Sequence, residues 1–186
     1  MFSKQLRPGL ELKLVEERHA LEVYSVIDAN RRYLRQWLPW IDMTTGPDAT
    51  LDWIRKALRQ FAKNKGFHAG IWHEGQFAGT IGCQPISWLN RRVEVGYWLA
   101  ERAQGKGIMT AATAALLDHA FDEWALNRVQ IQCAAGNLKS QAIPRRLGFT
   151  QEGIVREGQL LYGTYHDLIL FGMLRDQWRS VPRDKF

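Results

Sequence analysis

Cysteine is scarce in this chain of 186 residues, which has only Cys83 and Cys133. Each lies in an apolar stretch, and neither has histidine, cysteine or acidic neighbours at the spacing of a metal site. We therefore expect two buried, reduced thiols, as is usual in a reducing compartment. This pattern argues against a disulfide scaffold, zinc binding and thiol redox chemistry, and we expect no metal cofactor.

Long apolar runs are also missing. No stretch approaches the ~18 consecutive apolar residues of a membrane-spanning helix, and Met1 to Gln5 lack the apolar core of a secretion signal. Low-complexity tracts, internal repeats and Ser/Gly linkers are absent, while 46% hydrophobic and 24% charged residues are values of a globular protein. We expect one soluble, cytoplasmic domain over residues 1–186, with no membrane partner.

Positive charge is in excess, with a net charge of +6 at pH 7. The excess favours anionic partners, such as phosphates or an acidic protein. Lysines and arginines are interspersed with acids instead of being gathered with aromatic residues on one face, which argues against direct binding of nucleic acid. The most basic stretch, residues 55–65, has the pattern of the solvated face of an amphipathic helix.

The periodicity of apolar residues predicts an α/β (α+β) fold with a mixed, mostly antiparallel sheet of about seven strands flanked by helices. Helical spacing occurs in residues 19–30, 31–37, 48–65, 108–124 and 137–147. Segments typical of strands are residues 10–15, 67–73, 76–87, 91–99, 128–134, 149–155 and 165–174. Strands and helices do not alternate regularly, so the sheet is not doubly wound.

The clearest functional signal is a glycine-rich segment between a strand and a helix, Arg102-Ala-Gln-Gly105-Lys-Gly107. A strand that leads through such a turn into a helix leaves backbone N–H groups unpaired, and with the helix dipole they form an anion site. Glycines 105 and 107 let a phosphate approach the backbone, and Lys106 adds charge. The dinucleotide fingerprint needs a glycine where Thr110 stands, and the ATP-binding P-loop pattern is absent.

This segment, Arg102-x-x-Gly105-x-Gly107, resembles the Arg/Gln-x-x-Gly-x-Gly/Ala signature of the GNAT acetyltransferases. Asn137-Leu-Lys-Ser140, followed by Gly148-Phe149, is similar to the Asn-x-x-Ser…Gly-Phe segment of the same family. The resemblance implies an acetyl-CoA-dependent N-acyltransferase, with acetyl-CoA as co-substrate. In that family the amine attacks the thioester directly in a ternary complex.

Other segments resemble one branch of the family, the Rim-type ribosomal-protein N-terminal (serine/alanine) acetyltransferases and their bacterial relatives. They are Asn30-Arg31…Trp37-Leu-Pro-Trp40, Glu94-Val-Gly-Tyr-Trp-Leu99, Gly107-Ile-Met-Thr110 and Tyr165-His-Asp167. The branch implies a homodimer that acetylates the N-terminal α-amine of a protein, with an acidic ribosomal protein as candidate partner. The alternative acceptor is a small amine, such as an antibiotic of the aminoacyl-nucleotide type.

The resemblance also implies which residues hold coenzyme A. The pyrophosphate would lie on the backbone of the glycine loop, and the pantetheine arm would pair with the preceding strand like an added strand. Two residues of the Asn-x-x-Ser segment would contact the arm from the other side. The cofactor-binding candidates are Trp98, Leu99, Arg102, Gln104, Gly105, Lys106, Gly107, Ile108, Met109, Asn137 and Ser140.

The general base is left open. Some Rim-type members use a glutamate after the Gly-Phe pair, but the corresponding position here holds Gln159, which cannot take a proton. Glu157 and Glu94 are the catalytic candidates, and each has an alternative role as a solvated or paired strand residue. An α-amine with a pKa of about 7.7–8.0 is partly neutral at pH 7, so a weak base or a water chain is sufficient.

Ser140 is the third catalytic candidate, because a neutral hydroxyl near the sulfur can donate to the leaving thiolate. Its alternative role is to cap or pin its helix. Tyr97, Tyr162 and Tyr165 could take the same catalytic part, as tyrosines do in many members of the family.

Three tryptophans, Trp37, Trp40 and Trp53, belong to N-terminal helices that flank the acceptor cleft in a GNAT enzyme. They either pack in the core or form a stacking wall for a nucleotide-like substrate. A last alternative is a sensor that binds acyl-CoA without turnover, which the lack of an identified base leaves open.

Overall fold

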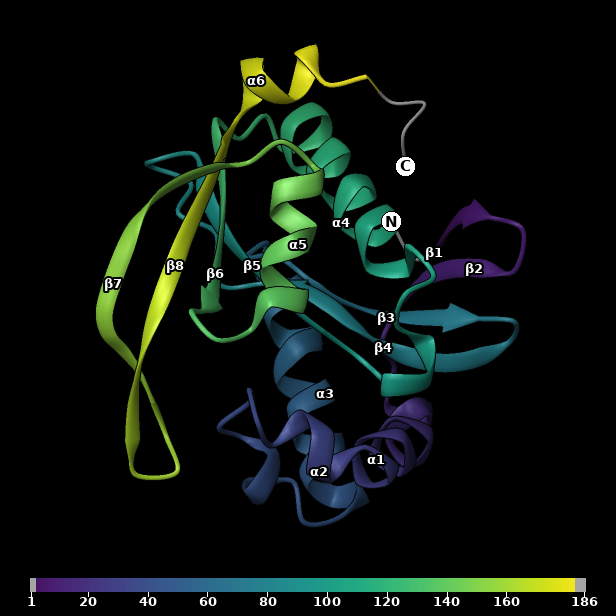
Figure 1. Ribbon diagram of the computed structural model, residues 1–186. Coiled ribbons are helices and arrows are strands. Elements are labelled where there is room, and N and C mark those ends of the chain that lie inside the picture. The colour runs from purple at the N-terminus through teal and green to yellow at the C-terminus, as the bar shows by residue number, and fades with distance from the viewer. Residues whose placement is uncertain (1–2, 183–186) are drawn as a thin grey trace. The chain divides into compact units, whose positions relative to one another are not determined.

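The computed structural model describes residues 3–182, which divide between two compact units (Figure 1). The first unit comprises Met1–Cys83 and Tyr97–Ile108, and the second comprises Gln84–Gly96 and Met109–Phe186. The chain passes between the units within β5 (Arg92–Leu99) and at the first residue of α4 (Ile108–Asp118).

Antiparallel strands dominate the first unit. Its strands β1, β2, β3 and β4 are neighbours in that order, and the end of β5 follows β4. They span Ser3–Arg7, Leu10–Leu14, His68–His73 and Gln76–Cys83. The Glu74-Gly75 turn between β3 and β4 lies where the sequence predicts it, with positive φ at both residues.

The second unit contains a parallel pair of strands. The start of β5 pairs in parallel with β6, which is followed by β8 and then β7, both in antiparallel register. β6 spans Arg128–Ala134, β7 spans Thr150–Leu161 and β8 spans Thr164–Leu174. The predicted α+β class with a mixed, mostly antiparallel sheet is confirmed, with eight strands instead of about seven.

Helices cover both units. The first unit holds α1 (Ala20–Ala29), α2 (Arg31–Leu34) and α3 (Pro47–Ala62), with short 3-10 turns at Glu17–His19, Ile41–Met43 and Glu101–Ala103. The second holds most of α4, then α5 (Leu138–Arg146) and α6 (Arg175–Ser180). Among the described residues, no helix is long and apolar enough to span a membrane.

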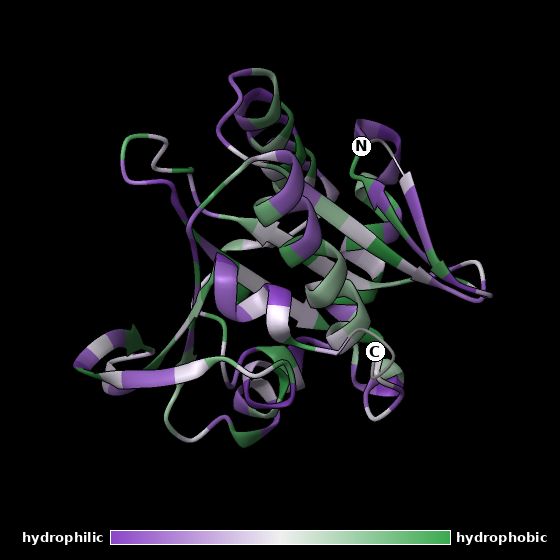
Figure 2. Cartoon of the chain, turned by 90° about the horizontal axis from the view of Figure 1, so that it is seen from above, coloured by the Kyte–Doolittle hydropathy of each residue, from purple (hydrophilic) through white to green (hydrophobic). Residues whose placement is uncertain are grey.

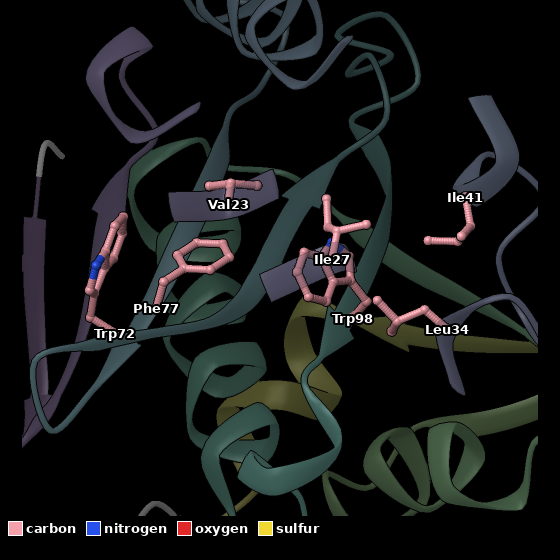
Figure 3. Packing of buried hydrophobic residues seen from close by; sticks show 7 residues of the cluster. All are labelled: Val23, Ile27, Leu34, Ile41, Trp72, Phe77 and Trp98. Atoms are coloured by element: carbon pink, nitrogen blue, oxygen red, sulfur yellow. The ribbon is translucent and has the colours of Figure 1, made fainter. Parts of the chain in front are cut away.

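Aliphatic and aromatic side chains together form a core cluster of the first unit (Figure 3). Phe77 lies between two tryptophans, 5.2 Å from the ring of Trp72 and 5.9 Å from that of Trp98. Trp40 packs on the same cluster, 6.4 Å from Trp98, and Trp53 packs 5.6 Å from the ring of His68. Trp40 and Trp53 are therefore partly buried side chains that pack against core residues.

Several elements depart from the sequence prediction. The expected strand of residues 76–87 ends at Cys83, and the expected helix of residues 31–37 ends at Leu34. The prediction lacks β1 because Ser3, Lys4, Gln5 and Arg7 are polar and the strand has no apolar face. In Figure 2 the strand that leads away from the N label is largely purple, the hydrophilic colour. The expected helix of residues 108–124 ends as a π-helix over His119–Glu123. β7 extends six residues beyond the predicted end at Val155.

The cysteine prediction is confirmed, since both side chains are buried and neither sulfur forms a disulfide within the described residues. Burial raises the pKa of the Cys83 thiol to about 12, so it stays protonated at neutral pH. Burial also lowers the pKa of His68 to about 4. Within residues 3–182, no three His, Cys, Asp or Glu side chains gather as a metal ion would require.

Candidate functional site

The glycine loop lies between β5 and α4, where the sequence predicts it. Gly105 and Gly107 have φ values of 74° and 71°, the left-handed region that glycine enters without strain. The 3-10 turn before the loop closes with a hydrogen bond from Gln104 N to Glu101 O, and α4 begins at Ile108. A Cβ built on Gly105 would meet no atom within 4 Å, so the space beside the loop is open.

An anion fits this loop on physical grounds. The first N–H groups of α4 have no partner within the helix, and they lie at the positive end of its dipole. The side chains of Ile108 and Met109 are buried, so these residues can reach a ligand only through their backbone. Arg102 and Lys106 are exposed beside the loop and add positive charge. The residues present therefore suit a diphosphate.

Sequence reasoning missed one cation at the loop. Arg7, at the end of β1, donates from Nη2 to the carbonyl oxygen of Lys106 at 2.6 Å. The two residues are 99 positions apart in the chain. Nothing in the polar segment around Arg7 signals this contact, because it depends on where the β1–β2 hairpin lies within the first unit.

The strand end before the loop offers its backbone rather than its side chains. Trp98 is buried against Phe77, and Leu99 is half-buried. A Cβ on Gly79 of β4 would lie 2.2 Å from the carbonyl oxygen of Trp98, so this glycine permits the close approach of β4 to β5. Ala100 N donates to Ala78 O and continues the pairing.

On its other side, β5 pairs with β6 only at its start. The parallel register joins Arg92, Val93 and Glu94 with Arg128, Val129 and Gln130. Among the described residues of the second unit, the register does not continue to Val95 and Gly96. A strand that leaves its neighbour presents unpaired N–H and C=O groups, to which an extended ligand can add.

The start of α5 is organised by Asn137. Its side-chain oxygen accepts a hydrogen bond from the Ser140 N–H at 3.1 Å, the bond of a helix N-cap. The cap is thus Asn137 and not Ser140, which leaves the Ser140 hydroxyl outside the capping bond. That hydroxyl lies 3.2 Å from the Cys133 sulfur, at hydrogen-bond distance, in a half-exposed environment.

A buried glutamine fixes α5 to the end of β6. Gln141 is 4% exposed, and its Nε2 donates to the carbonyl oxygens of Ala134 at 3.1 Å and Ala135 at 2.8 Å. Pro144 inside α5 has no N–H to donate to the Ser140 carbonyl, four residues earlier. Sequence reasoning missed Gln141, since glutamine in a helix ordinarily faces solvent.

Glu94 is held by two amides of the neighbouring strand. Its Oε2 accepts from Gln130 Nε2 at 2.8 Å and from Gln132 Nε2 at 2.9 Å. Alternate residues of β6 share one face, so both glutamines reach the same carboxylate oxygen. A substrate ammonium group would have to compete with these two donors for that oxygen.

Glu157 lies in an irregular part of β7. The register shifts between Val155 and Gln159, and Glu157 has a φ of 51°. Its N–H donates to Asp167 Oδ1 of β8 at 2.8 Å, while its own side chain is exposed. Because the bulge interrupts the alternation of side chains, a spacing of two residues does not place Glu157 and Gln159 on one face of the strand.

The predicted site residues thus form two groups, each within one unit. The first unit holds the strand end and the loop, Trp98, Leu99, Arg102, Gln104, Gly105, Lys106, Gly107 and Ile108. The second holds Met109 and the side chains proposed for catalysis and for the pantetheine arm, Glu94, Asn137, Ser140 and Glu157. Within the second group, Asn137 and Ser140 contact each other, and Glu94 and Glu157 have separate partners.

The chain matches a protein-family model and several known proteins over most of its length. Residues 10–150 match the model of an acetyltransferase (GNAT) domain. YdaF of Bacillus subtilis, provisionally named a ribosomal N-acetyltransferase, is 36% identical over 181 residues, which are 97% of this chain and 99% of that protein. The ribosomal-protein-serine acetyltransferase of Escherichia coli is 30% identical over 90% of this chain and 94% of its own length.

Solved structures agree with the sequence matches. RimL, the ribosomal L7/L12 α-N-protein acetyltransferase, in complex with coenzyme A has a TM-score of 0.89 at 28% identity, over 93% of this chain and 98% of that one. The microcin C7 self-immunity acetyltransferase MccE, in complex with acetyl-CoA and AMP, has a TM-score of 0.88 at 25% identity, over 91% and 94%. With its glycine loop and capped α5 in the predicted places, this chain belongs to the GNAT acetyltransferase family.

Proposed function

We propose that this enzyme transfers the acetyl group of acetyl-CoA to the N-terminal α-amine of a protein, with a ribosomal protein as the leading acceptor. Its relatives named above include enzymes that acetylate ribosomal proteins, among them one acting on serine and one on L7/L12. Such a substrate would be met in the cytoplasm. We also propose that the enzyme forms a homodimer. A second copy would cover the exposed apolar side chains of the β7–β8 hairpin, which are Ile154, Leu160 and Tyr165.

The observation that carries the choice of amine is the state of the two glutamates. Glu157 is exposed, and the Glu94 carboxylate already accepts two amide hydrogen bonds. Neither is a buried carboxylate without donors, which is the environment that makes a strong base. An α-amine loses its proton about 2.5 pKa units more readily than lysine, a difference of roughly 3.4 kcal/mol. A weak base therefore suffices for an α-amine and falls short for lysine.

The proposed roles follow from where each group lies. Acetyl-CoA, when bound, supplies the thioester whose carbonyl the amine attacks. The loop from Gln104 to Met109 holds its pyrophosphate through backbone N–H groups, with Arg102 and Lys106 contributing charge. The backbone of Trp98 and Leu99 accepts the pantetheine arm as an added strand, and the Asn137 side chain contacts the arm from α5.

The Ser140 hydroxyl is proposed to donate a hydrogen bond to the sulfur as the thiolate leaves. Asn137 caps the helix at the Ser140 N–H, and Gln141 ties α5 to β6, so the hydroxyl is carried on a fixed helix start. Glu157, Glu94 or a water molecule takes the proton of the amine.

A small amine of the aminoacyl-nucleotide type is the second candidate acceptor. The similarity to MccE, whose structure holds acetyl-CoA and AMP, favours it. Of the three tryptophans that could stack on a base, Trp40 and Trp53 pack against the hydrophobic core clusters of the first unit. This packing ranks the nucleotide-like acceptor second.

Thiol release from acetyl-CoA against a panel of amines tests the proposed function. The panel contains peptides with a free N-terminal Ser or Ala, the same peptides blocked at the N-terminus but carrying lysine, and aminoacyl-nucleotide analogues. We expect turnover with free N-termini alone. Turnover with the nucleotide analogues alone would replace the first candidate by the second, and binding of acetyl-CoA without any turnover would favour the sensor.

The pH dependence of kcat/KM separates the two glutamates. Glu157→Gln is expected to lower the rate at low pH about tenfold or more while coenzyme A affinity stays unchanged, because the variant loses its proton acceptor. Glu94→Gln keeps an oxygen for Gln130 and Gln132, and we expect its rate to stay within about threefold. Profiles unaltered in both variants would assign the proton to water, and a larger loss in Glu94→Gln would make that residue the base.

A further inference from the structure

A β-bulge determines where the side chain of Arg7 lies. In the β1–β2 pair, Gln5 lies opposite Glu11 but Arg7 lies opposite Leu10, so two steps along β1 match one step along β2. The Gln5 side chain holds this bulge, since its Nε2 donates to Arg7 O at 2.6 Å and to Leu10 O at 3.2 Å. A bulge of this kind changes the direction of the side chains that follow it.

The guanidinium of Arg7 reaches the glycine loop within the same unit. Its Nη2 donates to Lys106 O at 2.6 Å, and its Nη1 is the nearest atom to a Cβ built on Gly107, at 3.8 Å. The Lys106 carbonyl would otherwise present a negative dipole beside an anion. A guanidinium has five N–H donors. Among the described residues, the acceptor of the Arg7 guanidinium is the carbonyl oxygen of Lys106.

We propose that Arg7 is a further cofactor-binding residue, which donates to a phosphate group of coenzyme A at the glycine loop. The inference rests on the proposed binding of acetyl-CoA there. A planar guanidinium matches two phosphate oxygens at once and stays charged at any physiological pH. Arg7 is exposed, and its bond to Lys106 holds it in place before a ligand arrives. Preorganisation of this kind lowers the entropic cost of binding.

Calorimetric titration of the full chain with coenzyme A tests this role. Arg7→Gln is expected to weaken binding about tenfold, since a charged hydrogen bond at an exposed site is lost. Arg7→Lys, which keeps the charge but not the planar pair of donors, should recover part of the affinity. The loss should shrink as salt is raised, because screening weakens an ionic contact. Arg59→Gln, an exposed arginine on α3, is the matched control and should bind like the wild type.

A second ligand identifies the phosphate. The same titration is repeated with 3′-dephospho-coenzyme A. If Arg7→Gln then binds as tightly as the wild type, Arg7 contacts the 3′-phosphate. If Arg7→Gln still binds more weakly, Arg7 contacts the pyrophosphate. If Arg7→Gln and Arg7→Lys lose the same affinity at every salt concentration, Arg7 only supports the loop and the proposal is wrong. Unchanged affinity in Arg7→Gln would also overturn it. If the wild type fails to bind coenzyme A, the proposed function itself is wrong.

Discussion

Gly105→Glu is expected to abolish measurable binding of coenzyme A, with affinity reduced by about a hundredfold or more. The new side chain would place a negative charge where the first N–H groups of α4 meet the phosphates. Because no atom lies within 4 Å of a Cβ at this position, the chain can accommodate the substitution and the effect is on binding. Calorimetry with coenzyme A measures it, and melting temperature reports on folding.

Two control variants isolate the charge at the loop. Gly105 has positive φ, so any side chain there costs about 1–2 kcal/mol of backbone strain. Gly105→Ala introduces that strain without charge and should weaken binding much less. Gly75→Glu introduces strain and charge together in the open β3–β4 turn, where φ is 72° and no atom lies within 4 Å of a Cβ. It should bind coenzyme A like the wild type. Micromolar affinity retained in Gly105→Glu would refute the loop assignment.

Ser140→Ala is expected to lower kcat about a hundredfold while the Kd for coenzyme A changes by less than about threefold. The hydroxyl is proposed to act on the leaving sulfur, and its loss would therefore affect the transition state more than cofactor binding. The helix start should survive, because Asn137 caps the backbone N–H of residue 140 and not its side chain. Steady-state kinetics and calorimetry together measure the two effects.

Cys133→Ala is the companion to that variant, since it removes the hydrogen bond between Cys133 and Ser140 but keeps the serine hydroxyl. If the hydroxyl acts on the substrate, Cys133→Ala should lose much less kcat than Ser140→Ala. Equal losses in the two variants would show that the serine serves to hold the end of β6. A rate unchanged in Ser140→Ala would leave Ser140 with a structural role.

The predictable parts of the site are those in which local sequence dictates the backbone. Gly105 and Gly107 form the turn that the glycine-rich pattern predicts, with β5 and α4 on either side as expected. The start of α5 is also predictable, because an asparagine before a helical segment is a common N-cap. These features need contacts only within a few residues.

Other parts of the site depend on pairs that are distant in the chain. The glutamines that hold Glu94 come from β6, and the parallel register that aligns them is not set by any turn. Gln141 is buried because α5 packs on the end of β6, against the ordinary preference of glutamine for solvent. Gly158 is the one residue in the sequence that indicates the β7 bulge. A Cβ added to it would lie 2.9 Å from Val155 Cγ1.

The sequence by itself determined the family resemblance, the α+β class and the glycine loop, because these rest on short motifs and on periodicity that each segment carries alone. Only the tertiary structure decided that Arg7 reaches Lys106 and that Glu94 is held by two glutamines. The physical reason is that a hydrogen bond needs its two groups within about 3 Å. Strand register and bulges determine that proximity, and they are properties of paired segments rather than of either one.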